Sequence, residues 1–311
     1  MEKQNILITG GAGAIGSNLS RRLCKKNSIV VVDDLSEGFE MNLRDILGNI
    51  DYLKGDILDP QILRELGKRE FDYVFHLAAA FANEKSVQNP EYDASVNIMG
   101  SIGLLNLFKG TGIKRFVYAA SSSSYGACEY AVEDMPPNPS TPYAFSKYAG
   151  EWYALEFNKL YGMKTTSVRY FNSYGPGERP GEYRNVVPNF FSLAMDGKPL
   201  PIKGTGEETR SFTYISDALE GTILAAAREE AIGEAFNIAS GEETKVITLA
   251  EKINEICNNP AGVEYLEKRS WDEVGKRSAS IEKAKKILGY APRVNLDEGL
   301  KKTHEWFLEN R

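Results

Sequence analysis

The hydrophobic pattern in the first half of the chain is a series of short, continuous apolar runs. Each run is rich in β-branched residues and is followed by a segment long enough for a helix. Continuous apolar strands that are connected by helices are typical of a parallel sheet covered on both faces. The pattern predicts six strands, at residues 5–10, 28–34, 50–56, 73–79, 115–121 and 165–172.

Helical segments between these strands complete the predicted fold. We expect helices at residues 16–25, 60–69, 91–110 and 142–160. Alternating strands and helices predict an α/β fold with a doubly wound parallel sheet of the Rossmann type. After residue 172 the chain becomes rich in Gly, Pro and Arg, as in loops that shape a ligand site. We therefore expect a dinucleotide-binding domain at residues 1–170 and 213–240, and a smaller, interleaved C-terminal α/β domain at residues 171–212 and 241–311.

Composition narrows the class of protein. The chain has 311 residues, of which 42% are hydrophobic, so it contains enough apolar material for a core. Its net charge of -6 argues against a nucleic-acid partner, because binding to phosphates requires a surplus of Lys and Arg. No apolar run is long enough for a signal peptide or a membrane span, which predicts a cytoplasmic protein without a membrane partner.

The cysteines and histidines argue against a metal site. Cys24, Cys128 and Cys257 are odd in number and lack CxxC spacing, so neither a disulfide framework nor a zinc site is indicated. The chain has only two histidines, His76 and His304, and we expect His76 to end a strand inside the core. We predict no metal.

A glycine-rich loop at residues 8–19 follows the first predicted strand and opens the first predicted helix. Its sequence, ITGGAGAIGSNL, contains GxGxxG, whose glycines permit a tight turn and let the backbone approach a pyrophosphate at the helix N-terminus. The next strand ends in Asp33 and Asp34, where a carboxylate would bind the adenosine ribose and repel a 2'-phosphate, which favours NAD over NADP. A glycine turn beside an acidic surface loop is the alternative. The cofactor-binding residues predicted in the loop are Gly10, Gly13, Ala14, Ile15 and Gly16.

Tyr143 and Lys147 lie four residues apart on the predicted helix at 142–160, so they share a face. A buried phenol can act as a base near neutral pH only if positive charges favour the phenolate. An adjacent ammonium and a cationic nicotinamide would supply those charges. An exposed Tyr and Lys on an amphipathic helix is the alternative, and the glycine loop argues against it.

A series of motifs, in order along almost the whole chain, carries a resemblance to a known family. They include TGGAGAIGS at residues 9–17, DDLSEG at 33–38, SSSSYG at 121–126, YAFSK at 143–147 and RYFNSYGPG at 169–177. On these motifs the chain resembles the extended short-chain dehydrogenase/reductase superfamily, in its NAD-dependent nucleotide-sugar epimerase/dehydratase group. It looks most like the UDP-glucose 4-epimerases. The order of the motifs is more specific than any one of them.

The resemblance implies further binding residues and a homodimer. It places Asp56 and Ile57 near the adenine, and it places Phe171 and Asn172 at the junction of nicotinamide and substrate. The other residues that it assigns to the cofactor are Leu77, Ala78, Ala79, Asn97, Tyr143 and Lys147. Those that it assigns to the nucleotide diphosphate of the sugar, in the second domain, are Asn185, Arg210 and Arg269; surface ion pairs are the alternative for the two arginines. The implied dimer forms through the helices at 91–110 and 142–160.

Four serines at residues 121–124 select among the reactions of the family. The resemblance makes Ser121 the hydroxyl that binds the sugar 4-hydroxyl, and in dehydratases and decarboxylases the next positions supply a carboxylic acid. Here those positions are Ser122 and Ser123, which we expect to contact the substrate and whose hydroxyls cannot replace the acid near neutral pH. The serines therefore favour oxidation at C4 and argue against elimination.

The predicted function is that of an NAD-dependent 4-epimerase of a nucleotide-diphosphate sugar, of the UDP-glucose/galactose type. Tyr143, as a phenolate, takes the proton of the 4-hydroxyl, directly or through Ser121, while Lys147 binds the nicotinamide ribose and lowers the pKa of Tyr143. A one-way 4-dehydrogenase or 4-ketoreductase with the same three residues is one alternative. A catalytically silent NAD-sensing protein is another, although such proteins generally lack the Tyr or the Lys.

The segment at residues 269–286 departs from the family pattern. Trp271 replaces a Gly, Ser280 replaces an Asp, and Lys276 and Arg277 lie between them. The resemblance places this region beside the sugar. Arg277 would bind an extra carboxylate or phosphate there, or it faces solvent, so the sequence leaves the identity of the sugar open.

Overall fold

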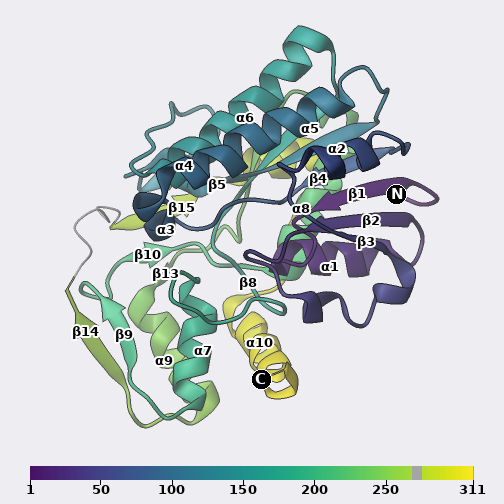
Figure 1. The fold of residues 1–311 in the computed structure, drawn as a ribbon. Coiled ribbons are helices and arrows are strands. Elements are labelled where there is room, and N and C mark those ends of the chain that lie inside the picture. Colours follow the sequence, from purple (N-terminus) through teal and green to yellow (C-terminus); the bar gives the residue numbers. More distant parts are fainter. Residues whose placement is uncertain (268–274, 311) are drawn as a thin grey trace.

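A seven-stranded parallel sheet forms the centre of the protein in the computed structural model, which describes residues 1–267 and 275–310 (Figure 1). The chain runs outward from β1 in both directions, so the strand order reverses beside β1. In α/β sheets of this kind, ligands bind at the carboxyl ends of the strands where the order reverses. In spatial order the strands are β12 (Ala235–Ile238), β7 (Thr165–Tyr170), β5 (Arg115–Ser121), β4 (Tyr73–His76), β1 (Asn5–Thr9), β2 (Ser28–Asp33) and β3 (Asp51–Lys54).

Both faces of the sheet are covered, which explains the continuous apolar runs in the sequence. Along β1, Ile6 and Ile8 belong to one buried cluster and Leu7 belongs to the other, because successive side chains of a strand point to opposite faces. On one face pack α2 (Pro60–Leu66), α5 (Ser101–Phe108) and α6 (Pro142–Tyr161), and on the other pack α1 (Ala14–Leu23) and α8 (Ile215–Ala227). The fold class predicted from the sequence is confirmed.

The six predicted strands all lie in this sheet, but the seventh was not among them. β12 is a four-residue strand, and so short an apolar run has no periodicity to distinguish it. The helix predicted over residues 91–110 is divided into α4 (Pro90–Ala94), a π-helical segment (Ser95–Gly100) and α5. His76 ends β4 and is buried, as expected.

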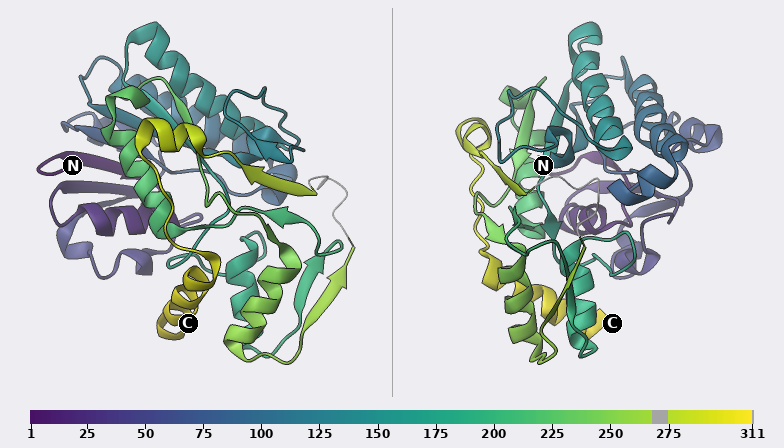
Figure 2. Two further views of the ribbon diagram at one scale, coloured as in Figure 1. Left: turned by 180° about the vertical axis from the view of Figure 1, so that it is seen from behind. Right: turned by 90° about the vertical axis from the view of Figure 1, so that its left-hand side faces the viewer.

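The remaining elements gather below the carboxyl ends of the large sheet (Figure 1). Seen from behind, the segment after β15 runs along the large sheet beside α8 and then returns to this lower part as α10 (Figure 2). Short strands make three small sheets, and the predicted domain limits stay a prediction. The elements are β6 (Tyr130–Ala131), β8 (Ser173–Tyr174), α7 (Val186–Met195), β9 (Leu200–Lys203), β10 (Thr209–Arg210), β11 (Thr213–Tyr214), β13 (Thr244–Lys245), α9 (Val246–Cys257), β14 (Val263–Leu266), β15 (Lys276–Ala279) and α10 (Leu296–Asn310).

None of the helices in residues 1–267 and 275–310 has the length and apolar character that crossing a membrane requires.

Helix α6 is seated on β5 and β7 by a close backbone approach and a buried ion pair. A Cβ atom at Gly150 would lie 2.2 Å from the Tyr118 hydroxyl of β5, so only glycine fits there. At the next residue, the Glu151 carboxylate accepts hydrogen bonds from Nε of Arg169, at 3.1 and 2.9 Å, and from Oγ of Ser167, at 3.0 Å. Glu151 and Arg169 are 1% and 8% exposed, so neither charge has water as an alternative partner. The pair therefore fixes where α6 sits along β7.

Replacing Arg169 by Met should destabilise the protein by about 3 to 5 kcal/mol, because it leaves the Glu151 charge buried without its partner. The double variant Arg169→Met, Glu151→Met should recover part of this loss. Chemical denaturation measures both. Lys68→Met is the control, since Lys68 pairs with Glu65 at the surface and its loss should cost less than about 1 kcal/mol. Equal losses for Arg169→Met and Lys68→Met would show that the buried pair does not hold α6 in place.

Candidate active site

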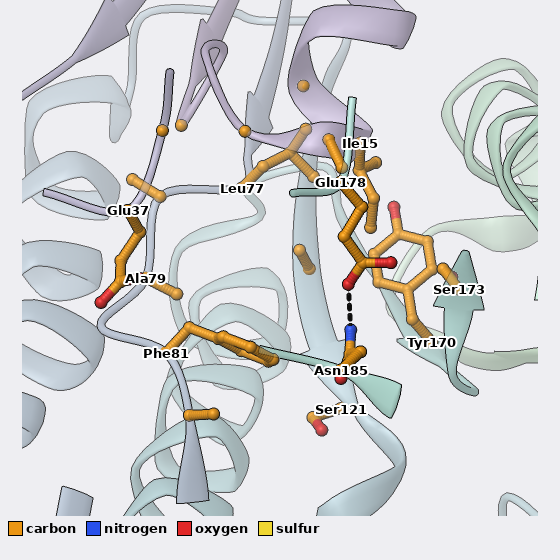
Figure 3. Close-up of a pocket in the computed structure, with 18 of the residues that line it drawn as sticks. Ile15, Glu37, Leu77, Ala79, Phe81, Ser121, Tyr170, Ser173, Glu178 and Asn185 are labelled. Atoms are coloured by element: carbon orange, nitrogen blue, oxygen red, sulfur yellow. Dashed lines mark hydrogen bonds between the residues drawn. The ribbon is translucent and has the colours of Figure 1, made fainter. Parts of the chain in front are cut away.

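A pocket of about 400 Å³ lies at the carboxyl ends of the large sheet, where the strand order reverses. Its volume is in the range of small-molecule sites. The walls come from the ends of β1, β2, β4, β5 and β7, from the first turns of α1 and α6, and from the loop at residues 172–185 (Figure 3). Polar groups from distant parts of the chain therefore face one another across it.

The glycine loop turns sharply from β1 into α1. Gly10 has φ +70, and a Cβ atom on it would lie 2.5 Å from the backbone nitrogen of Ala78 on the next strand. A Cβ atom on Gly16 would lie 2.2 Å from the carbonyl oxygen of Gly10. Gly13 is the N-cap of α1 and provides no capping side chain, so the N–H groups of the first turn are left to a ligand. This arrangement fits a pyrophosphate.

Asp33, the last residue of β2, lies at one end of the pocket. Its carboxylate accepts hydrogen bonds from the backbone N–H groups of Ala12 and Leu35, both at 2.8 Å. Burial raises the pKa of Asp33, and these two hydrogen bonds oppose the rise. Each oxygen keeps a lone pair for a further donor, as binding of ribose hydroxyls requires. Asp34 also lines the pocket, but its Oδ1 accepts hydrogen bonds from the N–H and Oγ of Ser36.

Tyr143 and Lys147 lie on the first two turns of α6 and are buried at the other end of the pocket. Burial lowers the pKa of Lys147 to about 8, and the negative charges of Asp93 and Glu151 limit this fall. Burial also raises the pKa of Tyr143, whereas a hydrogen bond to Ser121 lowers it. The Lys147 ammonium lies 4.6 Å above the ring of Tyr118. That Lys147 lowers the pKa of Tyr143 stays a prediction. With only the chain's own groups around it, Tyr143 is therefore protonated near neutral pH.

The four serines form one hydrogen-bonded turn at the end of β5. Oγ of Ser121 accepts hydrogen bonds from the N–H of Ser123, at 3.2 Å, and from the Ser123 hydroxyl, at 2.8 Å. With these two donors in place, the Ser121 hydroxyl keeps its own hydrogen to donate, and a hydrogen bond from it lowers the pKa of Tyr143. The Ser124 hydroxyl donates to the Ser121 carbonyl at 2.9 Å, so Ser124 holds the turn itself. Ser123 thus orients Ser121, a role that the sequence did not indicate.

Most residues that the sequence analysis assigned to the site do line this one pocket. They are Gly10, Gly13, Ala14, Ile15, Gly16, Asp33, Asp34, Asp56, Ile57, Leu77, Ala78, Ala79, Ser121, Ser122, Ser123, Tyr143, Lys147, Asn172 and Asn185. The pocket thus brings together the residues predicted for cofactor, for substrate and for catalysis. Their individual roles stay predictions.

Three assigned residues lie elsewhere in the structure. The Asn97 amide nitrogen donates to the carbonyl oxygen of Ala80 at 3.1 Å and to Ser146 at 3.0 Å, so it braces the wall from behind. Phe171 is fully buried in the core. Arg210, in β10, donates to the carbonyl oxygens of Thr209 and Gly275, and it is not part of the pocket wall. Arg269 and Trp271 lie outside the described residues.

Arg277 lines the pocket, and its guanidinium donates to the carbonyl oxygen of Gly126 at 2.9 Å. Gly126 follows the serine turn, so β15 and the turn meet at this wall. Of the two alternatives left open for Arg277, a place beside the ligand fits this position better than a place in solvent.

Several lining residues were not predicted, because they lie in loops without periodicity. Glu37 forms ion pairs with Lys85, on α3 (Asn83–Gln88), and with Arg184, at 2.9 Å, and so connects three segments around the pocket. Glu178 is also in the wall, and burial raises its pKa to about 7, while Asn185 and Arg184 lower it. The quoted motifs contained Glu37 and preceded Glu178, but nothing in their spacing marked either residue. The other unpredicted lining residues include Phe81, Tyr170, Ser173, Arg179 and Tyr183.

Within residues 1–267 and 275–310, no three His, Cys, Asp or Glu side chains are grouped as a metal site would need.

Known sequences place the chain in a family. The sequence model of the NAD dependent epimerase/dehydratase family matches residues 6–239. A putative UDP-glucose 4-epimerase of Methanocaldococcus jannaschii is 32% identical, over 98% of this chain and 99% of its own. A UDP-N-acetyl-alpha-D-glucosaminuronate decarboxylase of Bacillus cytotoxicus is 33% identical, over 99% of this chain and 98% of its own.

Solved structures agree with this placement. Epimerase Mth375 of Methanothermobacter thermautotrophicus superposes with a TM-score of 0.96 at 44% identity, over 99% of this chain and 93% of that one. The UDP-N-acetylglucosamine 4-epimerase of Methanobrevibacter ruminantium, in complex with UDP-N-acetylmuramic acid, gives a TM-score of 0.94 at 30% identity, over 100% of both chains. Sequence match and fold lead to the same result: the chain belongs to the NAD dependent epimerase/dehydratase family.

Proposed function

We propose that the protein is an NAD-dependent 4-epimerase of a UDP-sugar. The observation that carries the proposal is the cluster of Ser121, Tyr143 and Lys147 at one end of the pocket, beside a turn that provides only hydroxyls at Ser122 and Ser123. Two other reactions of the family, elimination by dehydratases and decarboxylation, use an additional acid or base next to the sugar. The serine turn has none.

NAD fits the pocket by the chain's own geometry. The uncapped first turn of α1 offers donors for the pyrophosphate, and the Asp33 carboxylate offers acceptors for a ribose. Lys147 lies at the far end, within reach of a second ribose. When bound there, NAD supplies a hydride acceptor that can also return the hydride.

The chain's residues handle the proton of the sugar 4-hydroxyl. Tyr143, as a phenolate, can take this proton directly, or through Ser121 once the Ser123 hydroxyl gives up its hydrogen bond to Oγ of Ser121. Because burial raises the pKa of Tyr143, forming that phenolate depends on positive charge near it. Lys147 and the cationic ring of the cofactor provide such charge. The 4-keto sugar then turns about its diphosphate linkage, and the proton returns by the same route.

The known relatives support a UDP-sugar substrate. Epimerases named for UDP-glucose and UDP-N-acetylglucosamine match almost the full chain. The decarboxylase of Bacillus cytotoxicus matches equally well, so identity alone does not choose the reaction. In the pocket, Asn172, Asn185 and Arg277 offer donors for a diphosphate.

A homodimer is the proposed assembly. Large apolar side chains are exposed on the helical segments that cover one side of the sheet, including Met99, Phe145 and Trp152, at 59%, 57% and 47%. Phe145 and Trp152 lie two turns apart on α6 and so share a face.

We propose the cytoplasm as the compartment, because Cys24, Cys128 and Cys257 are free thiols.

The purified protein should convert UDP-glucose and UDP-galactose, or their N-acetyl analogues, into one another. NMR of the C4 proton measures the inversion. Reduced nicotinamide should not accumulate during turnover, because each hydride is returned. A net change in its absorbance would instead indicate the one-way dehydrogenase or ketoreductase, and no inversion with UDP-, GDP-, CDP- or dTDP-sugars would exclude the epimerase.

Tyr143→Phe should lower kcat by about a hundredfold or more, because it removes the group that takes the proton. The change deletes one oxygen at a buried position, so NAD binding, followed by fluorescence, should stay close to that of the wild type. Tyr148→Phe is the control, since Tyr148 lies on the same helix but not in the pocket wall. A Tyr143→Phe variant with full activity would contradict the mechanism.

Trp152→Glu should convert the dimer into a monomer, because a charge would be buried at the interface without a partner. Light scattering after size-exclusion chromatography measures the molar mass. Leu308→Glu is the matched control, since Leu308 is 63% exposed on α10, away from the proposed interface, and its loss should leave the dimer intact. A wild-type protein that is already monomeric would refute the proposed assembly.

A further inference from the structure

The side chain of Glu178 has a polar atom in the pocket wall that the protein itself does not satisfy. Asn185 donates a hydrogen bond to Oε1, but Oε2 is buried and has no hydrogen-bond partner. Two other buried atoms of the same wall, Oγ of Ser173 and Nε of Arg179, also have none. Buried polar atoms without a partner are rare in folded proteins, so their presence in one pocket wall points to a ligand.

The segment that carries Glu178 is fixed against the first turns of α1. Nδ2 of Asn18 donates to the carbonyl oxygen of Pro176 at 2.8 Å. A Cβ atom on Gly177 would lie 3.4 Å from Cα of Ala14 and 3.4 Å from Oγ of Ser17, so the two segments are in contact there. The backbone at Glu178 therefore lies beside the N-terminus of α1, whose N–H groups offer donors to a pyrophosphate.

From there the carboxyl reaches into the part of the pocket that leads toward the reaction residues. Figure 3 shows it near Ile15, Tyr170 and Ser173, with Asn185 between it and Ser121. With the pyrophosphate at α1 and the reacting ring beside Tyr143, as proposed above, the nicotinamide half of NAD would pass through this stretch. The glutamate therefore lies along the nicotinamide half rather than at the adenosine end, which Asp33 marks.

The charge of the Glu178 carboxyl matters because the oxidised and reduced forms of the cofactor differ in the charge of the nicotinamide ring. The nicotinamide ring is cationic when oxidised and neutral when reduced, whereas the pyrophosphate is the same in both. A carboxylate next to the ring therefore favours the oxidised form, and its effect is large where water is excluded. Burial raises the pKa of Glu178 to about 7, so the carboxyl can change its charge near neutral pH.

Other charged groups also face this part of the pocket. Arg179 and Arg184 come from the same loop, Arg277 from β15, and Lys147 and Tyr143 from α6. Tyr170, at the end of β7, has a raised pKa because it is buried, and α1 contributes no charged side chain to the described wall. Arg184 is already paired with Glu37. None of these arginine, lysine and tyrosine side chains carries a carboxyl, so Glu178 supplies the acidic side chain among them.

We propose that Glu178 is the counter-charge for the nicotinamide, ionised beside the oxidised ring and protonated beside the reduced one. As the hydride leaves C4 with its electron pair, the hydroxyl proton passes to Tyr143 and Glu178 takes a separate proton from solvent. Both protons are released in the reverse order when the hydride returns. By favouring the oxidised cofactor, Glu178 drives hydride return, and this consequence rests on the proposed epimerase function. The preference for NAD+ over NADH in binding requires only that the protein binds NAD, whatever reaction it catalyses.

The test compares the dissociation constants of NADH and NAD+ without any sugar, by calorimetry, from about pH 6 to about pH 8. Below its pKa the carboxyl is neutral and the preference for NAD+ is lost; above it the preference is present. The ratio Kd(NADH)/Kd(NAD+) should therefore rise with pH, and Glu178→Gln should lower it about tenfold at the upper end. Lys147 loses its charge near pH 8 and acts in the same direction, so the variant isolates Glu178.

Glu182→Gln is the matched control, because Glu182 lies in the same loop but is exposed and outside the pocket wall. It should keep the wild-type ratio. The proposal is overturned if Glu178→Gln keeps the wild-type ratio at every pH, or if the wild-type ratio does not change with pH.

A second measurement needs only the wild-type protein and so does not depend on folding of the variant. Calorimetry in two buffers of different ionisation enthalpy gives the protons exchanged on binding. Near pH 7, NAD+ should release about half a proton more than NADH, because the cationic ring ionises Glu178. Equal proton release for both forms overturns the proposal. Neither experiment contains a sugar, so failure of the epimerase function would leave both results intact.

Discussion

The buried ion pair between Glu151 and Arg169 sets the position of α6 above the sheet, and the reaction centre depends on that position. Tyr143, Lys147 and Glu151 follow one another at intervals of four residues, so they form one stripe on the helix. When Arg169 fixes the last member of the stripe on β7, the first two are fixed relative to β5 and its serine turn. A helix that moved by one residue would turn the phenol away from Ser121.

The pKa of the Tyr143 phenol shows what the chain's own groups provide at this end of the pocket. Burial opposes ionisation of Tyr143 and also weakens the charge of Lys147. The protein thus provides geometry and exclusion of water, and leaves the final stabilisation of the phenolate to a ligand. The same low dielectric that makes Tyr143 reluctant to ionise makes each nearby charge more effective.

The sequence predicted those parts of the protein that depend on neighbours along the chain. Periodicity and short spacings predicted the six apolar strands, the glycine loop, Asp33 and the pair of Tyr143 and Lys147. The strands lie in the large sheet, and the other residues line one pocket. Glu178 accepts a hydrogen bond from Asn185, and Ser123 donates one to Ser121, yet no periodicity or motif spacing marks either contact. The direction of the Tyr143 pKa also depends on burial, which spacing alone does not reveal.

The pairing of β6 with β15 joins two segments that are far apart in the sequence. β6 follows the serine turn, β15 carries Arg277, and Asn237 donates to the carbonyl oxygens of both Ala131 and Ser280, at 3.2 and 3.3 Å. A substitution that reshapes the wall around Arg277 therefore also moves the support of the hydroxyl that touches Tyr143. The wall at Arg277 and the serine turn are therefore mechanically coupled, and neither can be reshaped without displacing the other.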